Sequence, residues 1–191
     1  MEQLAQYHDL LADLGVEWGL IGPREVERLW ERHLDNCLAV TQDPTCLPHG
    51  ASVIDVGSGA GLPGLVWAIA RPDLRIVCAE PLERRVRFLR LAIDQLRVSN
   101  VEVQRARAQD VHLQADRVTA RAVARTSVLL PWLAPLVTPA GKMILLKGEK
   151  ARDEVAEARP WLERHRWQAH IREVGTPART RVVIVDRSDE G

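Results

Sequence analysis

Two patterns of apolar and polar positions alternate along most of the chain. After residue 50, short apolar runs such as 52–57 are followed by longer segments in which apolar residues recur every three or four positions. In the segment 82–96, Val86, Leu89 and Ile93 repeat in this way. The short runs predict strands and the periodic segments predict helices.

The predicted strands and helices follow one another in regular alternation. The strands cover residues 52–57, 75–80, 101–105, 118–122, 143–147 and 182–185. The helices cover residues 62–71, 82–96, 128–137 and 151–164. Because right-handed crossovers between parallel strands need intervening helices, this order predicts an α/β fold with a Rossmann-like, mostly parallel, doubly wound sheet.

Two amphipathic segments precede this core. Apolar positions in residues 4–14 and 26–38 recur at helical spacing, which predicts a small N-terminal helical cap over residues 1–43. A loop rich in Pro and Gly separates the cap from the core. We place the core at residues 50–187 and expect one compact unit. Residues 188–191 are expected to be frayed.

Composition narrows the class of protein. The chain has 191 residues, 46% of them hydrophobic and 27% charged, which suits one ordinary globular domain. There is no apolar run of membrane-spanning length, and acidic residues interrupt the region that a signal peptide keeps apolar, so we predict a cytoplasmic protein without a membrane partner. The net charge of zero argues against coating nucleic acid through the overall field. We expect a monomer.

The three cysteines predict no metal chemistry. They form no Cys-x-x-Cys pair, and an odd number cannot pair fully within one chain. We therefore expect no disulfide framework and no metal site.

The stretch DVGSGAGLPG at residues 55–64 carries the candidate chemistry. A strand that ends in a glycine-rich turn and leads into a helix exposes backbone N–H groups to a nucleotide-type ligand. A phosphate-binding P-loop is excluded, because Leu65 and Val66 stand where it needs Lys and a hydroxyl residue. A dinucleotide fingerprint fits loosely from Gly59, which keeps a nicotinamide-dependent oxidoreductase open. An S-adenosylmethionine site is the third interpretation.

An acidic residue at the end of the next strand supports the nucleotide interpretation. Glu80 stands where a ribose diol should lie, and its carboxylate can accept hydrogen bonds from both hydroxyls. The pattern of the loop and of this strand end marks five candidate cofactor residues: Asp55, Gly57, Gly59, Gly61 and Glu80.

Four stretches in this order resemble one known family. DVGSGAGLPG at 55–64, RVRFL at 85–89, ARAVA at 120–124 and LKG at 146–148 are similar to the RsmG (GidB) family of bacterial methyltransferases. The resemblance covers about residues 5–187. It implies a class I S-adenosylmethionine-dependent fold, a partner in 16S rRNA of the small ribosomal subunit, and methylation of guanine at N7.

The resemblance also implies further site residues. By matching position it adds cofactor contacts at Leu62, Ala108, Gln109 and Arg121. Arg121 ends a strand where ligands of open sheets bind, and we assign it the catalytic role of clamping the cofactor carboxylate or orienting the guanine. The candidate RNA contacts are Arg28, Arg32, His33 and Lys147.

Methylation of guanine at N7 needs few catalytic groups. Watson–Crick pairing leaves N7 free as an unprotonated acceptor, so no general base is required and catalysis can rest on orientation of the reactants.

The departures from the family at residues 19–21 and at Gln109 leave a third hypothesis, a nucleotide- or RNA-binding module without turnover.

Overall fold

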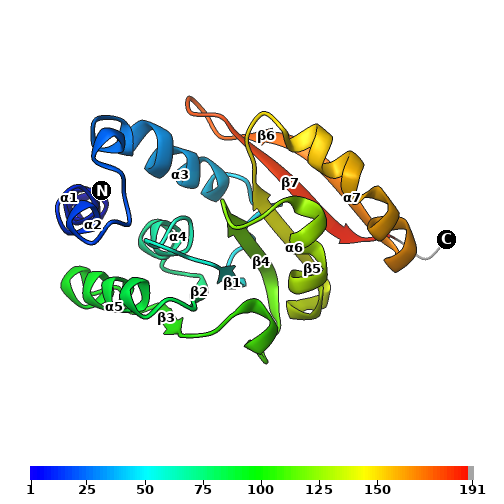
Figure 1. The fold of residues 1–191 in the computed structure, drawn as a ribbon, viewed down its shortest axis with the longest axis horizontal. Coiled ribbons are helices and arrows are strands. Elements are labelled where there is room, and N and C mark those ends of the chain that lie inside the picture. Colours follow the sequence, from blue (N-terminus) through cyan, green and yellow to red (C-terminus); the bar gives the residue numbers. More distant parts are fainter. Residues whose placement is uncertain (189–191) are drawn as a thin grey trace.

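The structure is a computed structural model that describes residues 1–188. A seven-stranded sheet with the order β3-β2-β1-β4-β5-β7-β6 forms its centre (Figure 1). The strands are β1 Ser52–Val56, β2 Arg75–Ala79, β3 Val101–Gln104, β4 Ala115–Arg121, β5 Val137–Leu146, β6 Trp167–Val174 and β7 Thr180–Arg187. Strands β1 to β5 run parallel, whereas β7 is antiparallel to both β5 and β6.

Helices cover both faces of the sheet, as the alternating pattern predicts. They are α1 Glu2–Ala12, α2 Leu14–Glu17, α3 Asp35–Thr41, α4 Gly64–Ala70, α5 Glu83–Leu96, α6 Thr126–Leu133 and α7 Ala151–His165. Apolar residues of α1, α3, α4 and α5 form one buried cluster on the first face. Those of α6 and α7 form a second cluster on the opposite face. The predicted doubly wound α/β fold is confirmed.

Two regions near the C-terminus differ from the sequence prediction. The helix predicted over 128–137 ends at Leu133, and after a short 3-10 turn the chain becomes β5 at Val137. Strand β6 was not predicted, because it lies at the edge of the sheet and most of its side chains are partly or fully exposed, which removes the apolar run. The frayed end predicted over 188–191 lies outside the described residues, apart from Ser188.

The cap shares its core with the sheet. Tyr7 is fully buried and its hydroxyl donates to the carbonyl of Ala60 in the glycine loop. The indole of Trp67 on α4 donates to the carbonyl of Cys37 on α3 over 2.8 Å. These contacts place the cap directly above the loop that carries the candidate chemistry.

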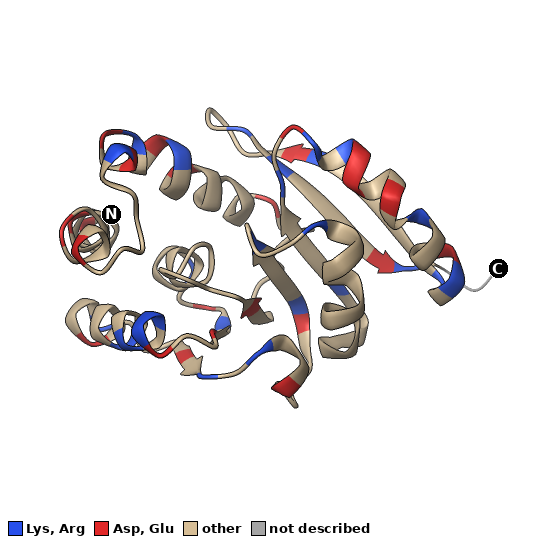
Figure 2. Cartoon of the chain, in the orientation of Figure 1, with Lys and Arg blue, Asp and Glu red and all other residues tan. Residues whose placement is uncertain are grey.

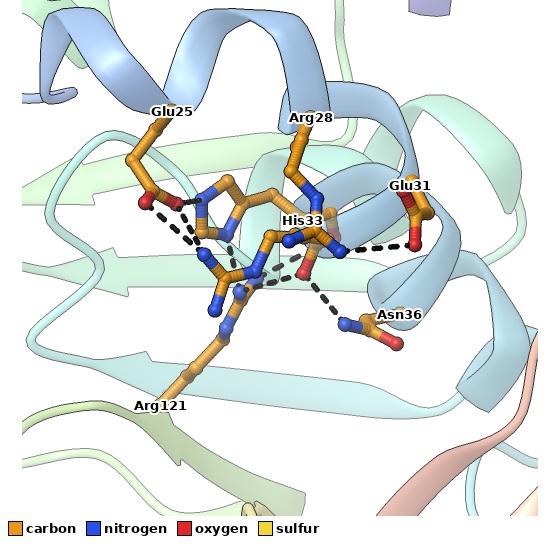
Figure 3. Close-up of polar contacts among 7 residues, drawn as sticks. Glu25, Arg28, Glu31, His33, Asn36 and Arg121 are labelled. Carbon is orange, nitrogen blue, oxygen red and sulfur yellow. Dashed lines mark hydrogen bonds and ion pairs between the residues drawn. The ribbon is translucent and has the colours of Figure 1, made fainter.

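The second cap segment is less regular than its apolar spacing predicts. In place of one amphipathic helix it forms a 3-10 segment Pro23–Arg28, a π-helical turn Trp30–Leu34 and then α3. Pro23 occupies the first turn of the 3-10 segment, where its missing N–H has no partner to lose. The changes of helical pitch turn successive side chains away from a single face, which brings several polar groups of this segment toward the sheet edge (Figure 3).

The strand order creates a crevice at one edge of the sheet. β1 and β4 are neighbours, and the connection that leaves β1 leads to β2 whereas the connection that leaves β4 leads to β5, in the opposite direction across the sheet. Ligands of open α/β sheets bind at such a switch point. Gly57, Glu80 and Ala122 directly follow β1, β2 and β4 there. Within residues 1–188, no helix is long and apolar enough to cross a membrane.

Candidate functional site

The glycine loop presents bare backbone to the crevice. Gly57 has a φ of +70° and a Cβ there would come within 2.6 Å of Cγ2 of Val123. Gly59 has a φ of +60°, and a Cβ there would meet only the carbonyl oxygen of Gly57, at 3.8 Å. The side of Gly59 on which a side chain would stand is therefore open space, which fits a loop that receives a ligand.

Asp55 supports this loop from below. Its carboxylate is fully buried, and Oδ2 accepts a hydrogen bond of 2.9 Å from the backbone N–H of Gly64 at the start of α4. Oδ1 has no hydrogen-bond partner among the described residues. Burial raises the pKa of Asp55 to about 7. A Cβ at Gly61 would likewise point at buried groups, including Leu65 and Tyr7. Asp55 and Gly61 therefore lie behind the loop rather than on its ligand side.

Glu80 is fixed at the end of β2. Its side chain is 1% exposed, and the two carboxylate oxygens accept hydrogen bonds of 2.9 Å from the backbone N–H groups of Gly59 and Leu82. The guanidinium of Arg85 lies 3.6 Å from Oε2. The backbone of the glycine loop thus orients the carboxylate of Glu80, so the loop and the residue predicted to bind the ribose are held together by a hydrogen bond.

Two neighbouring cavities open at this edge of the sheet. The larger, of about 830 Å³, is lined by Glu80, Ala108, Gln109 and Trp132 among others. The smaller, of about 300 Å³, lies against the loop and the cap, and its lining includes Gly59, Leu62 and Arg121. Three residues, Gly57, Arg85 and Ala122, border both cavities.

The structure thus gathers most of the predicted cofactor residues around one space. The exceptions, Asp55 and Gly61, line neither of the two cavities and act beneath the loop. Among residues 1–188 there is no group of three side chains able to hold a metal ion.

Arg121 connects this space to the cap. Its guanidinium donates to the backbone carbonyls of Arg32 and His33 over 3.2 and 3.4 Å and to Nδ1 of His33 (Figure 3). It also donates to Sγ of Cys37 over 3.3 Å. Nε2 of His33 lies 3.1 Å from a carboxylate oxygen of Glu25. Because arginine only donates, Nδ1 of His33 accepts, and the imidazole proton lies on Nε2 toward Glu25.

The electrostatics of His33 agree with this arrangement. Burial lowers the pKa of the imidazole, and the positive charge of Arg121 lowers it further, against a smaller raising effect of Glu25. The neutral imidazole is therefore favoured, in the tautomer that the two neighbours require.

A third cavity, of about 760 Å³, lies on the other side of Arg121. Its lining includes Arg32, His33 and Lys147, three of the four predicted RNA contacts, together with Arg121 and Ala122. The fourth predicted contact, Arg28, lies outside this lining. Its exposed guanidinium is 3.3 Å from the carboxylate of Glu31.

The ammonium group of Lys147 is engaged within the protein. Nζ donates to the carbonyl of Ala124 over 2.9 Å and to Glu154 over 2.8 Å, and the Lys147 side chain is only 8% exposed. The same Glu154 oxygen accepts from the backbone N–H and the hydroxyl of Thr126, each over 2.9 Å. Burial would raise the pKa of Glu154, but the hydrogen bonds from Lys147 and Thr126 bring it below its ordinary value. These hydrogen bonds fix the backbone around Ala124 and Thr126, which follows Arg121.

Several residues of the site were not predicted from the sequence. Arg85 was visible within the RVRFL motif, but nothing in the sequence connected it to Glu80. Glu25 and Glu154 carried no signal, because each acts through a partner that is distant or irregularly spaced in the chain. Trp132 stands on α6 in a run that reads as core.

Residues 1–180 match a family described as GidB, rRNA small subunit methyltransferase G. The chain belongs to the GidB family. It is 55% identical over 163 residues to the ribosomal RNA small subunit methyltransferase G of Thermobifida fusca (strain YX), a match that spans 84% of this chain and 68% of that relative. The identity to the protein of the same name from Kineococcus radiotolerans is 52% over 160 residues, or 82% of this chain and 62% of the relative. The chain thus spans about two thirds of the length of these curated relatives.

The fold of this GidB chain is shared with more distant methyltransferases. A SAM-dependent methyltransferase from Aquifex aeolicus superposes with a TM-score of 0.62 at 19% identity, over 86% of this chain and 98% of that one. At this identity the likeness shows the fold alone, and it confirms the predicted class I methyltransferase sheet. Membership of the GidB family favours a methyltransferase over the nicotinamide-dependent oxidoreductase.

Proposed function

We propose that this protein transfers a methyl group from S-adenosylmethionine to N7 of a guanine in 16S rRNA of the small ribosomal subunit. One observation carries the proposal. Arg121 and Ala122 line both the smaller cavity at the glycine loop and the 760 Å³ cavity, so a cofactor in the first and a nucleotide in the second would be direct neighbours. The names of the relatives, ribosomal RNA small subunit methyltransferase G, support methyl transfer to rRNA of the small subunit.

The residues around the loop fit this cofactor. The open face at Gly59 leaves room for a ligand against the backbone, and the oriented carboxylate of Glu80 can accept from ribose hydroxyls. The amide of Gln109, in the larger cavity, can pair with an adenine edge. Leu62 lines the smaller cavity on the cap side, where the methionine end would lie. When bound, S-adenosylmethionine supplies an electrophilic methyl group on its sulfonium.

The protein's own contribution is orientation. N7 of guanine carries a free lone pair, so no side chain has to remove a proton before attack. We assign Arg121 to orient the guanine, because its guanidinium is held by four acceptors of the cap and lies between the two spaces. Placing two reactants in line supplies about 7–11 kcal/mol in favourable cases.

The test is transfer of a labelled methyl group from S-adenosylmethionine to small ribosomal subunits that lack 7-methylguanosine. Nucleoside digestion then identifies the product. Labelled 7-methylguanosine in multiple turnovers is expected, and it would also rule out a binding module without turnover. Cofactor binding without any labelled nucleoside would contradict the proposal.

We further propose that the protein acts in the cytoplasm as a monomer. The rRNA substrate places the reaction in the compartment where small subunits are assembled. Light scattering of the purified chain should give a mass close to the 21.4 kDa of one copy. A stable dimer at working concentrations would contradict the monomer.

A further inference from the structure

A pair of arginines on the β6–β7 hairpin shares one carboxylate at the rim of the 760 Å³ cavity. Nη2 of Arg181 lies 3.2 Å from Oε1 of Glu173, and Nη1 of Arg179 lies 3.9 Å from Oε2 of the same residue. All three side chains line the cavity that also contains Arg121. Figure 2 shows basic positions both on this hairpin and on the cap segment near it.

The hairpin is anchored where these arginines stand. The hydroxyl of Thr180 donates over 2.9 Å to the backbone and side-chain oxygens of Asn36 in the cap. Nη1 of Arg181 donates to the carbonyl of Gly148 over 3.2 Å, which leaves Nη2 directed at Glu173. Arg181 is thus held in place from two sides, while the side chain of Arg179 is 74% exposed.

The position of the pair connects two hollows of the surface. Glu173 and Arg179 line the 760 Å³ cavity and also a neighbouring hollow of about 460 Å³ that extends past Gln42 and Thr176. An RNA strand with one nucleotide inside the 760 Å³ cavity could therefore continue past Glu173 and Arg179 into the second hollow. A small free ligand inside the cavity would have no need of the second hollow.

The chemistry of the pair favours a phosphate over the carboxylate. An exposed ion pair contributes only about 0–1 kcal/mol, so Glu173 is a weak competitor for its two partners. Guanidinium groups bind phosphate through paired hydrogen bonds, and binding to a nucleic acid also releases counterions. Two guanidinium groups that already converge on one anion are prearranged for another.

We propose that Arg179 and Arg181 bind a backbone phosphate of the RNA strand next to the target guanosine, and that Glu173 occupies them until RNA displaces it. The inference rests on the proposed function, because it takes the 760 Å³ cavity as the site of the target nucleotide. It assigns RNA recognition to the C-terminal hairpin, a part of the chain in which the sequence marked no site.

The test compares three variants with a matched control. Glu173→Gln frees the arginines, whereas Arg179→Gln and Arg181→Gln each remove one of them. Glu83→Gln is the control, because Glu83 forms an equally exposed ion pair of 2.7 Å with Arg105, with side chains 50% and 59% exposed, and neither residue lines the 760 Å³ cavity. Dissociation constants are measured by fluorescence anisotropy with a labelled single-stranded fragment of 16S rRNA that contains the target guanine, over a range of salt concentrations.

Glu173→Gln should bind the fragment about twofold to fivefold more tightly than the parent, the gain expected for removal of a weak competing ion pair. Each arginine variant should bind more weakly, and the slope of log K against log salt should fall by about 0.7 in magnitude. Glu83→Gln should match the parent. Equal affinity of Glu173→Gln and Glu83→Gln, or unchanged slopes in both arginine variants, would overturn the inference.

Two further arms separate the possible failures. Inorganic phosphate should compete with the fragment more strongly on the parent than on Arg181→Gln, because only the parent keeps both guanidinium groups, and equal competition on the two proteins would overturn the assignment of a phosphate to this pair. Methyl transfer by the parent is measured in parallel. If the parent transfers the methyl group but the variants bind like the control, only the hairpin assignment fails. If the parent transfers none, the proposed function fails whatever the binding data show.

Discussion

Arg121 at the end of β4 donates a hydrogen bond to Nδ1 of His33 in the cap, and this contact joins the edge of the sheet to the segment that covers it. The bond requires a neutral imidazole, because a proton on Nδ1 would face the guanidinium. Glu25 holds the other ring nitrogen over 3.1 Å and so fixes the tautomer. The position of Arg121 between the cavities therefore depends on the protonation state of a residue outside the sheet.

A pH dependence of stability follows from His33. Its pKa in the folded chain is below the value of about 6.5 expected in the unfolded chain. The unfolded state therefore binds more protons between the two pKa values, and the stabilisation present above about pH 6.5 is lost as the pH falls from there through the lower pKa of the folded chain. Urea denaturation from about pH 8 to about pH 5 should show a smaller loss of unfolding free energy in His33→Gln than in the parent. Parallel curves for the two proteins would contradict the assignment.

Asp55 should act in the opposite direction. Burial raises its pKa to about 7, above the unfolded value of about 3.9, so its contribution is present at low pH and is lost as the pH rises through about 7. Asp55→Asn keeps an oxygen for the N–H of Gly64 and carries no charge to bury. Relative to the parent, the variant should be more stable at about pH 8 than at about pH 5, again by urea denaturation. A relative stability that does not change with pH would show that the buried carboxyl does not titrate.

Gly59→Ala should separate ligand binding from folding. A left-handed conformation costs a non-glycine residue about 1–2 kcal/mol, and the added methyl group would occupy the open side of the loop. Gly50→Ala is the matched control, since Gly50 has a φ of +71° with nothing within 4 Å of its Cβ position. Both variants should lose similar stability, but only Gly59→Ala should bind S-adenosylmethionine at least about tenfold more weakly in calorimetry. Equal cofactor affinity in both would show that the ligand does not approach Gly59.

Lys147 was predicted to contact RNA, but its contacts indicate that it holds the backbone after β4 in place beside the cavities. A substitution can distinguish the two roles. Nζ of Lys147 joins Ala124 to Glu154, so Lys147→Met should leave a largely buried carboxylate without its cation and reduce stability by about 2–4 kcal/mol. The double variant Lys147→Met with Glu154→Gln should recover part of that loss. The salt dependence of RNA binding should stay that of the parent. A slope reduced by about 0.7 would show that Lys147 contacts a phosphate.

The architecture and the ligand loop could be predicted from the amino-acid sequence. The spacing of apolar residues within a short segment shows which face of a helix or strand is buried. This information lies in residues that are close together in the chain, so it can be read from the sequence. The glycines of the loop and Glu80 at a strand end were likewise visible, because parallel strands bring their carboxyl ends to one edge. The edge strand β6 lacked this signal, since both of its faces are partly exposed.

The contacts between distant side chains became visible only in the folded structure. His33 reaches Arg121 across 88 positions of the chain, and Lys147 and Glu154 meet around the backbone that follows β4. Asp55 and Gly61 belong to the glycine motif but lie beneath the loop, because the left-handed turns direct only part of it toward the crevice. Such contacts depend on how helices pack on the sheet, and packing joins residues whose spacing in the sequence follows no period.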